Sequence, residues 1–285
     1  MIKILRYFIE SIFVYFFFFI SKLLGLQMSR KVFSMIFKLF GPFFRSRKTI
    51  EKNLNRYSSQ LTLSEKNKII SNMWSNYGMT FVEYMYLKKL RIENGHIEVE
   101  GKKYLETILQ NNKPVIFVSG HFANFELMSM EITKNKNNLA TIYRPLNNIF
   151  LNFFMEYLRK KFVCPNQIKK GRTGVKSSIE FLKKNYSIAL MIDQRVSEGE
   201  KINLFGEKAY TTTLPAQLAL KFNLDIVPIS IIRKNNNFFF MKILDPIKST
   251  HFKDKISITQ KLNEKLEELI KENPDQWIWT HNRWK

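Results

Sequence analysis

The residues best suited to chemistry lie in one stretch of the sequence, PVIFVSGHFANFELMSM, at residues 114–130. An apolar β-type run ends at Ser119, Gly120 allows a tight turn, and a helical pattern begins near Asn124. The turn would place His121 at the carboxyl end of a sheet strand, where ligands bind in α/β proteins. An imidazole in that position can act as a general base on a bound substrate.

A carboxylate in the first turn of the predicted helix, Glu126, is the candidate partner for this imidazole. Five residues along one continuous helix rotate two side chains apart by about 140°, so His121 must precede the helix for the pair to meet. Glu126 would then hold one tautomer of the ring and stabilise the imidazolium. The sequence places no serine or cysteine as a nucleophile, so the substrate would supply it. The alternative is that His121 is a polar residue satisfied at a strand end.

Other reaction classes leave no signature in the sequence. The four histidines (His96, His121, His251 and His281) lack the spacing of a helical metal pair, and Cys164 is the only cysteine. The patterns GxxxxGK[ST] and GxGxxG for nucleotides and GxSxG for a nucleophilic serine are missing. We therefore expect no metal, no cofactor and no internal disulfide. We expect His281 to lie with the C-terminal tryptophans rather than with the candidate site.

The composition predicts a folded, basic protein with an anionic partner. The chain has 285 residues, 45% of them hydrophobic and 14% aromatic, which is enough for a hydrophobic core and excludes a disordered or collagen-like chain. The formal net charge of +22 favours nucleic acid, an anionic membrane surface or an anionic substrate as the partner.

Residues 1–26 predict a membrane anchor. Residues 11–21 are uncharged, but a bilayer span needs roughly 20 residues, and a longer run includes Arg6, Glu10 and Lys22. Arg6 and Glu10 can pair on a helix, and Lys22 can extend to the headgroups. No A-x-A type site for cleavage of a signal follows, and a buried core helix is the other alternative. We expect a retained anchor that spans the membrane or lies deep in its interface.

Residues 27–95 are expected to form a helical, basic region beside the membrane. Basic residues are denser after the anchor than before it, which places the body of the protein on the cytoplasmic side. Apolar patches such as residues 32–44 alternate with basic residues, a mixture suited to anionic lipid headgroups. The same mixture suits single-stranded nucleic acid, and the plainest alternative is an amphipathic helix packed on the domain.

Residues 96–285 predict one α/β domain. Strand-like runs alternate with helical patterns, which favours a mixed, largely parallel sheet flanked by helices. The strand-like runs are at residues 97–100, 115–119, 139–143, 188–192, 226–232 and 238–244. The helical patterns are at residues 102–110, 124–133, 149–160, 174–184, 215–222 and 258–272, and a further one precedes the domain at residues 62–90.

Six segments, in order along the chain, resemble one known family. They are GHFANFE (120–126), YRPLNN (143–148), ALMIDQ (189–194), LFGEKAYTTTLPAQLAL (204–220), IVPI (226–229) and PDQWIWTHNRWK (274–285). Over its whole length the chain resembles the late acyltransferases of lipid A biosynthesis, of the lauroyl and myristoyl acyltransferase type, within the glycerolipid acyltransferase superfamily. The H-x4-E pattern occurs by chance, but the ordered set and the Arg-Trp ending after W-x-W-x-H are specific.

The resemblance implies transfer of a fatty acyl chain from acyl carrier protein to a hydroxyl of a lipid A precursor, in lipopolysaccharide biosynthesis at the bacterial inner membrane. His121 would be the general base and Glu126 its orienting partner, with direct attack on the thioester and no covalent acyl-enzyme. Arg144 matches the basic residue of the second motif and suits phosphate binding or positioning near the dyad. Residues of the third motif region would shape the acceptor pocket: Asp193, Gln194, Gly206, Thr212 and Thr213.

The charge of the chain agrees with this resemblance. Lipid A precursors carry phosphates, acyl carrier protein is acidic and the membrane is anionic, so nucleic acid is not expected as a partner. Leu214 and Pro215 follow the threonine run where some relatives have glycine. Two other functions stay open: an enzyme that acylates a lysophospholipid or another glycolipid, and a non-enzymatic basic protein that tethers a membrane. Arg144 as a surface turn residue and Asp193 as a helix cap are the plainer alternatives for those two positions.

Overall fold

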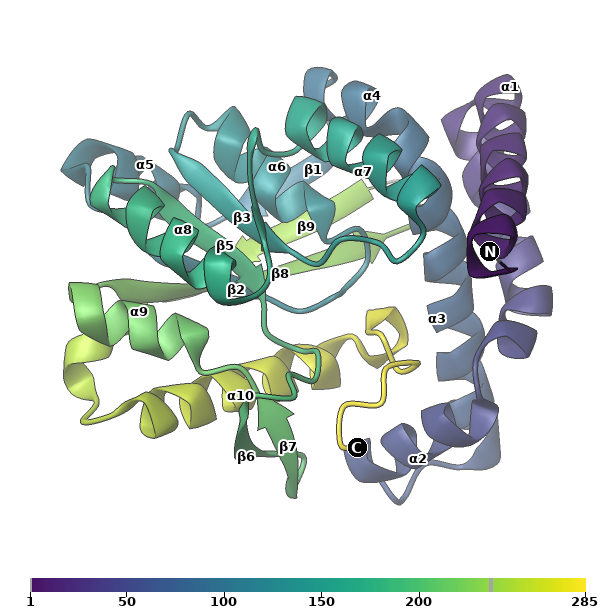
Figure 1. The fold of residues 1–285 in the computed structure, drawn as a ribbon. Helices are drawn as coiled ribbons and strands as arrows, with labels where there is room; N and C mark the ends of the chain where they lie inside the picture. The colour runs from purple at the N-terminus through teal and green to yellow at the C-terminus, as the bar shows by residue number, and fades with distance from the viewer. Residues whose placement is uncertain (1, 236–237) are drawn as a thin grey trace.

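A mixed, mostly parallel sheet forms the centre of the molecule, shown in Figure 1 as a computed structural model that describes residues 2–235 and 238–285. Strands β2, β5, β3, β4 and β8 run parallel to one another, whereas β9 and β10 pair antiparallel with β8. This arrangement confirms the predicted fold class. The order across the sheet is β1 (Ile97–Glu100), β9 (Phe238–Ile243), β8 (Asp225–Lys234), β2 (Ile116–Ser119), β5 (Ser187–Met191), β3 (Leu139–Tyr143) and β4 (Asn166–Lys169), with β10 (Ile247–Lys248) beside β8.

Helices cover both faces of the sheet and bury two hydrophobic cores (Figure 1). Phe117 belongs to one core, whereas its neighbours Ile116 and Val118 belong to the other. Because side chains alternate along a strand, β2 is buried on both sides, as a central parallel strand must be. The first core lies under α4 (Leu87–Ile92), α5 (Lys102–Asn111), α6 (Glu126–Lys134) and α7 (Ile149–Phe162). The second lies under α8 (Arg172–Lys183), α9 (Leu214–Phe222) and α10 (Lys255–Glu272).

The N-terminal helix α1 (Ile2–Phe44) consists of two arms that fold back on each other. The backbone leaves the helical conformation at Gly25, whose φ of 73° is a left-handed value that glycine adopts without strain. The rings of Phe17 and Phe33 then lie 5.7 Å apart, whereas in one straight helix about 24 Å would separate residues at this spacing. We call this element the N-terminal hairpin.

The second arm of the N-terminal hairpin packs closely on α3 (Leu63–Glu83). A Cβ atom on Gly78 of α3 would lie 2.1 Å from the carbonyl oxygen of Phe33, so only glycine allows the two backbones to approach this closely. Arg30 and Glu83 form a buried ion pair across the same interface, with Nε and Oε1 2.6 Å apart. The hairpin is therefore attached to the body of the molecule by both packing and charge.

Helix α2 (Arg47–Tyr57) and the strand pair β6 (Glu200–Leu204) and β7 (Glu207–Thr211) lie outside the central sheet (Figure 1). The C-terminal segment that follows α10 reaches α2, where Asn53 donates from Nδ2 to the carbonyl oxygens of Trp279 and His281, each at 2.9 Å. This contact fixes the last residues of the chain against the N-terminal helical region. Three short helices complete the fold, at Tyr84–Tyr86, Ser249–His251 and Pro274–Gln276.

The sequence missed β4 and the β6–β7 pair for different reasons. Strand β4 buries only Ile168, so it shows no apolar run. In the β6–β7 turn, Phe205 and Gly206 both have positive φ, at 51° and 76°, the backbone of a tight hairpin turn. The three-part division at residues 1–26, 27–95 and 96–285 stays a prediction. The N-terminal hairpin continues past residue 26, to Phe44, and β1 begins at Ile97, one residue after the second boundary.

Replacing Gly78 by alanine should detach the N-terminal hairpin partly from α3. The added methyl group meets backbone rather than a flexible side chain, so we expect Gly78→Ala to lower the free energy of unfolding by about 1–3 kcal/mol, as overpacking does. Denaturant titration of the purified protein in detergent measures this. Lys68→Ala, at an exposed position on the same helix, is the control and should change stability by less than about 0.5 kcal/mol. Equal midpoints for both variants would contradict the packing of the hairpin on α3.

Candidate active site

His121 lies in the turn after β2, and its ring is paired with Asp193, which follows β5. Strands β2 and β5 are parallel neighbours, so their carboxyl ends bring the two residues together. His121 Nδ1 lies 2.7 Å from Oδ1 of Asp193, and the backbone N–H of His121 donates to Oδ2 at 2.7 Å. Because an ionised carboxylate only accepts, Nδ1 of the neutral ring carries the proton and Nε2 is the free base.

Asp193 is fully buried and ionised. Burial alone would raise the pKa of Asp193, but the charge of the His121 ring and the hydrogen bonds from His121 and Trp277 outweigh burial and lower it. The indole Nε1 of Trp277 donates to Oδ2 at 2.9 Å. Asp193 therefore stays charged across the neutral range. An imidazole oriented by such a carboxylate is typical of general-base catalysis.

Glu126 has different partners from the one expected. Its Oε1 accepts from the Tyr84 hydroxyl at 2.7 Å and from Arg159 Nε at 2.7 Å. The side chains of Glu126 and Arg159 are 7% and 11% exposed, so this is a largely buried ion pair. The structure thus corrects the pairing expected from the sequence, since within the described residues the hydrogen bonds of the His121 ring lead to Asp193 and not to Glu126.

The shape of the turn explains this difference. Ala123 has a φ of 41°, which is unusual for a residue other than glycine and turns the chain sharply before α6 begins. As a result the Phe125 ring packs edge-on against the imidazole, with centroids 4.6 Å apart. Glu126, one residue further, points to α7, which carries Arg159.

The turn that carries His121 is held from two sides. The N–H of Ala123 donates to the carbonyl oxygen of Gln276 at 3.3 Å, and the carbonyl oxygen of Ala123 accepts from Thr80 Oγ1 at 3.1 Å. The next side chain, Asn124, donates from Nδ2 to Glu83 at 3.0 Å. These bonds compensate for the uncommon backbone conformation and fix the position of the imidazole.

Glu83 is the centre of a buried charge network behind this turn. Arg30 of the N-terminal hairpin and Arg233 of β8 both donate to its carboxylate, Arg30 from Nε at 2.6 Å and Arg233 from Nη2 at 3.0 Å. Burial would raise the pKa of Glu83, but the two guanidinium charges outweigh it and lower the pKa. Two arginines therefore keep the buried Glu83 ionised.

Two cations gather at the same edge of the sheet. Arg144 follows β3 and is exposed, as expected of a surface turn residue that can also contact an anion. Lys170 follows β4, and burial lowers its pKa, with a further lowering by the charge of Arg144 and an opposing effect of Glu198. The backbone N–H of Lys170 donates to the carbonyl oxygen of Tyr143 at 2.8 Å, so Arg144 and Lys170 follow neighbouring strands at the same edge of the sheet.

The C-terminal residues belong to the surroundings of the His121–Asp193 pair, which corrects the separate place expected for His281. Burial lowers the pKa of His281 to about 4, the charge of Asp193 opposes this, and Arg283 and His121 lower it further. His281 is therefore neutral near pH 7. Arg283 is fully buried and donates from Nη2 to Thr211 Oγ1 of β7 at 2.7 Å.

The other predicted binding residues come from three segments of the chain. Gln194 is half-buried directly after Asp193. Thr212 and Thr213 precede α9, where Thr212 Oγ1 accepts from the backbone N–H of Leu214 at 3.3 Å, so both serve the start of that helix. Gly206 lies in the turn between β6 and β7, at the far end of β7 from the threonine run. Their substrate contacts stay predictions.

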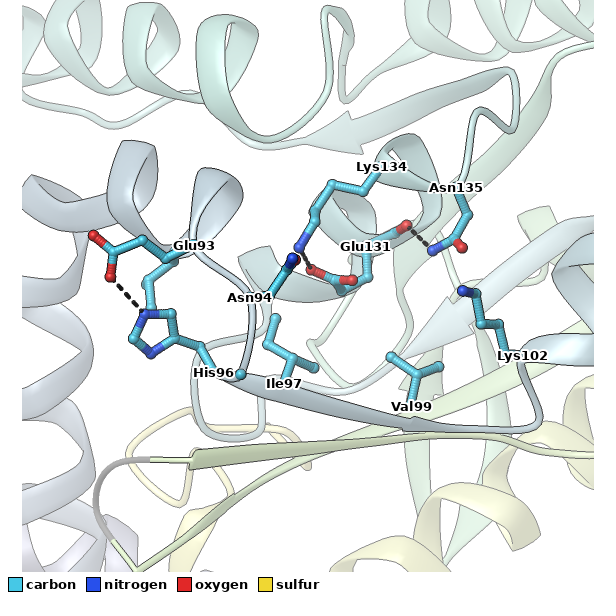
Figure 2. Close-up of a pocket in the computed structure, with 11 residues that line it drawn as sticks. Glu93, Asn94, His96, Ile97, Val99, Lys102, Glu131, Lys134 and Asn135 are labelled. Carbon is cyan, nitrogen blue, oxygen red and sulfur yellow. Dashed lines mark hydrogen bonds and ion pairs between the residues drawn. The ribbon is translucent and has the colours of Figure 1, made fainter.

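A cavity of about 260 Å³ lies at the opposite end of α6 from the His121 turn. Figure 2 shows its charged lining, in which Lys134 pairs with Glu131 at 2.9 Å and His96 with Glu93 at 3.3 Å. Neither His121 nor its carboxylate partner lines this cavity. The cavity is therefore separate from the candidate active site.

Among the described residues, α1 is the one helix long and apolar enough to cross a membrane. Its apolar side chains are mostly exposed, as expected of a helix in contact with lipid rather than with a protein core. Examples in its first arm are Phe13, Phe16 and Phe19, which are 59%, 55% and 61% exposed.

The molecule is an α/β protein with an oriented imidazole at the ligand-binding edge of its sheet and a long apolar helix at its N-terminus. This organisation suits acid–base chemistry at a membrane. The family model for bacterial lipid A biosynthesis acyltransferase matches residues 1–285, so the chain belongs to that family. It is an acyltransferase of lipid A biosynthesis, as the sequence resemblance implied.

Individual relatives agree with this membership. The lipid A biosynthesis palmitoleoyltransferase of Escherichia coli (strain K12) is 25% identical over 86% of this chain and 80% of its own length. The lauroyltransferase of the same strain is 24% identical over 85% and 79%, and the myristoyltransferase is 20% identical over 82% and 73%. A solved 1-acyl-sn-glycerophosphate acyltransferase from Thermotoga maritima is similar at 14% identity, over 89% of this chain and 100% of that one, with a TM-score of 0.42.

Asp193→Asn should reduce turnover more than Glu126→Gln. The asparagine amide cannot stabilise an imidazolium, so we expect a loss of about 10²–10⁴ in kcat with little change in KM. Glu126→Gln leaves the Arg159 charge poorly compensated, so its main effect should be a lower unfolding temperature. Steady-state kinetics and thermal unfolding of both variants measure this. A larger kcat loss for Glu126→Gln would make Glu126 the orienting carboxylate.

Thr80→Val should loosen the turn that carries His121. The substitution keeps the size of the side chain but removes the hydrogen bond to Ala123 and the one that the hydroxyl accepts from Arg233, so we expect a cost of about 1–2 kcal/mol in stability and a fall in kcat. Thr107→Val is the control, because Thr107 is exposed on α5 and its hydroxyl bonds only to its own helix. Similar kinetics for the two variants would show that the Thr80 bond does not position the imidazole.

Proposed function

We propose that His121 acts as the general base in a direct acyl transfer from a thioester to a hydroxyl of a lipid A precursor. Nε2 takes the proton of the hydroxyl as its oxygen attacks the thioester carbonyl. The new ester C–O bond forms, the C–S bond breaks, and the imidazolium returns the proton to the departing thiolate. The observation that carries this proposal is the bond from Nδ1 to Asp193, which leaves Nε2 as the basic nitrogen.

Asp193 is the orienting partner of His121 in this proposal, the role expected from the sequence for Glu126. It accepts from both the ring and the backbone N–H of His121, so it fixes the ring in one tautomer and stabilises the imidazolium that forms. This replaces the acceptor-binding role expected for Asp193. Glu126 supports the site through its bond to Arg159 on α7.

The acceptor carries phosphate, and Arg144 with Lys170 offers positive charge at the edge of the sheet where His121 lies. Arg144 is exposed and can reach a headgroup without breaking a contact in the protein interior. Gln194 follows β5, Thr212 and Thr213 follow β7, and all three stay candidates for acceptor contacts, together with Gly206. The names of the relatives support a lipid A precursor as the acceptor of this chain.

Acyl carrier protein is the donor we propose. It is acidic, and this chain has a formal net charge of +22. Exposed cations lie around the start of α8, and their positions suit an acidic partner: Lys169, Lys170 and Arg172. No cofactor is needed, because the thioester supplies the activated acyl group.

The enzyme works, we propose, on the cytoplasmic face of the bacterial inner membrane. The N-terminal hairpin supplies the apolar contact with lipid, and the basic residues that follow Lys22 supply attraction to anionic headgroups. Acyl carrier protein is soluble, so a catalytic body on this side meets both substrates.

His121→Ala should abolish transfer without unfolding the protein. We expect turnover from acyl-acyl carrier protein to a lipid A precursor to fall by about 10²–10⁴, with an unchanged unfolding temperature. Labelled acyl transfer measures this, and His96→Ala, outside the site, is the control. Acylation of lysophosphatidic acid alone would assign the enzyme to glycerolipids. Salt-dependent nucleic-acid binding that survives His121→Ala, without any acyl transfer, would favour a tethering protein instead.

A further inference from the structure

Helix α7 exposes an apolar stripe that no protein contact explains. Ile149, Phe153 and Tyr157 are 58%, 82% and 48% exposed and recur every four residues, so they share one face of the helix. The opposite face is already in the core, where Met155 and Leu158 are 9% and 7% exposed. The inner face of α7 is already packed, so an almost fully exposed phenylalanine on its outer face indicates a further apolar contact outside the protein.

The α7 stripe continues directly into the apolar surface of the N-terminal hairpin. The Phe8 and Phe150 rings lie 5.6 Å apart, as do those of Tyr15 and Phe154. The Tyr15 hydroxyl also donates to the carbonyl oxygen of Phe150 at 2.8 Å. The first arm of the hairpin therefore lies along α7, so lipid that contacts the arm also contacts the α7 stripe.

Positive charges border this joint surface. Lys160 and Lys161 end the exposed side of α7, and Lys3 and Arg6 begin the first arm of the hairpin. Lys161 Nζ also donates to the Tyr157 hydroxyl at 2.8 Å, which places a cation at the polar end of the stripe. Apolar side chains bordered by cations and an amphipathic tyrosine match the boundary between acyl chains and anionic headgroups.

We propose that Ile149, Phe153 and Tyr157 of α7 insert into the same leaflet of an anionic bilayer as the N-terminal hairpin. The helix begins five residues after Arg144, at the edge of the sheet where His121 lies. The inserted stripe therefore leads from the lipid to the candidate active site. On the proposed function, α7 is the side from which the acceptor lipid enters, with its headgroup at Arg144 and its acyl chains in the leaflet.

A spin label on the α7 stripe tests the insertion without relying on activity. The full chain with Phe153→Cys carries the label, since Cys164 is buried and inaccessible, and Phe238→Cys on β9, where the native side chain is 53% exposed, is the matched control. In vesicles of phosphatidylglycerol and phosphatidylethanolamine, the label at position 153 should gain accessibility to oxygen and lose at least severalfold accessibility to a water-soluble relaxation agent. The label at position 238 should not change.

Two results would overturn this proposal. One is equal water accessibility of the label at position 153 with and without vesicles. The other is protection of that label in vesicle-free solution that increases with protein concentration, which would assign the stripe to self-association.

A kinetic measurement separates the entry route from the chemistry. Phe153→Asp should raise KM for an acceptor in vesicles by about tenfold or more and leave kcat unchanged. This factor corresponds to the free energy gained when one phenylalanine side chain moves from water into an apolar environment. With the same acceptor dispersed in detergent, the variant should match the native protein. A variant defect of equal size in detergent would refute the entry route. Loss of all transfer by the native protein would instead refute the proposed function, while the label result would still decide the insertion.

Discussion

The candidate active site depends on one fully buried carboxylate. Asp193 has no exposure to water, so its charge persists only because donors of the protein replace the lost hydration. Those donors come from two distant segments, the ring and backbone N–H of His121 and the indole of Trp277. The hydrogen bonds that keep Asp193 ionised thus also join the ends of β2 and β5 to the C-terminal segment, and they fix the tautomer of the imidazole.

A second buried carboxylate, Glu83, is kept ionised by two positively charged arginines rather than by neutral donors. The charges of Arg30 and Arg233 outweigh the cost of burying Glu83. Asn124 donates from Nδ2 to Oε2 of Glu83, and this bond fixes the turn that carries His121. Removing either arginine would leave an incompletely compensated charge in the interior, so the network resists partial opening. Because Arg30 belongs to the N-terminal hairpin, the hairpin and the turn that carries His121 are attached to the same carboxylate.

Local pattern was sufficient for most of the fold and for the place of His121. Apolar runs and helical periodicity identified six of the strands and seven helical segments, because these depend on neighbours in sequence. The turn at Gly25 was missed, since the sequence on both sides is uniformly apolar and a helix could have continued. The pairing of Asp193 with His121 is not predicted, because it depends on strand order, which no local pattern encodes.

Glu126 shows why spacing alone misassigned the pair. A carboxylate five residues after a histidine is near it in sequence, but the left-handed conformation of Ala123 places Phe125 against the ring and directs Glu126 to the opposite side. There Glu126 binds Arg159, which holds α7 against α6, the helix that follows the turn carrying His121. Since a buried ion pair is costly to break from one side, α7 cannot move far without disturbing the start of α6. The carboxylate of the H-x4-E pattern thus connects the helix that we propose to enter the bilayer with the imidazole that we propose to accept the proton.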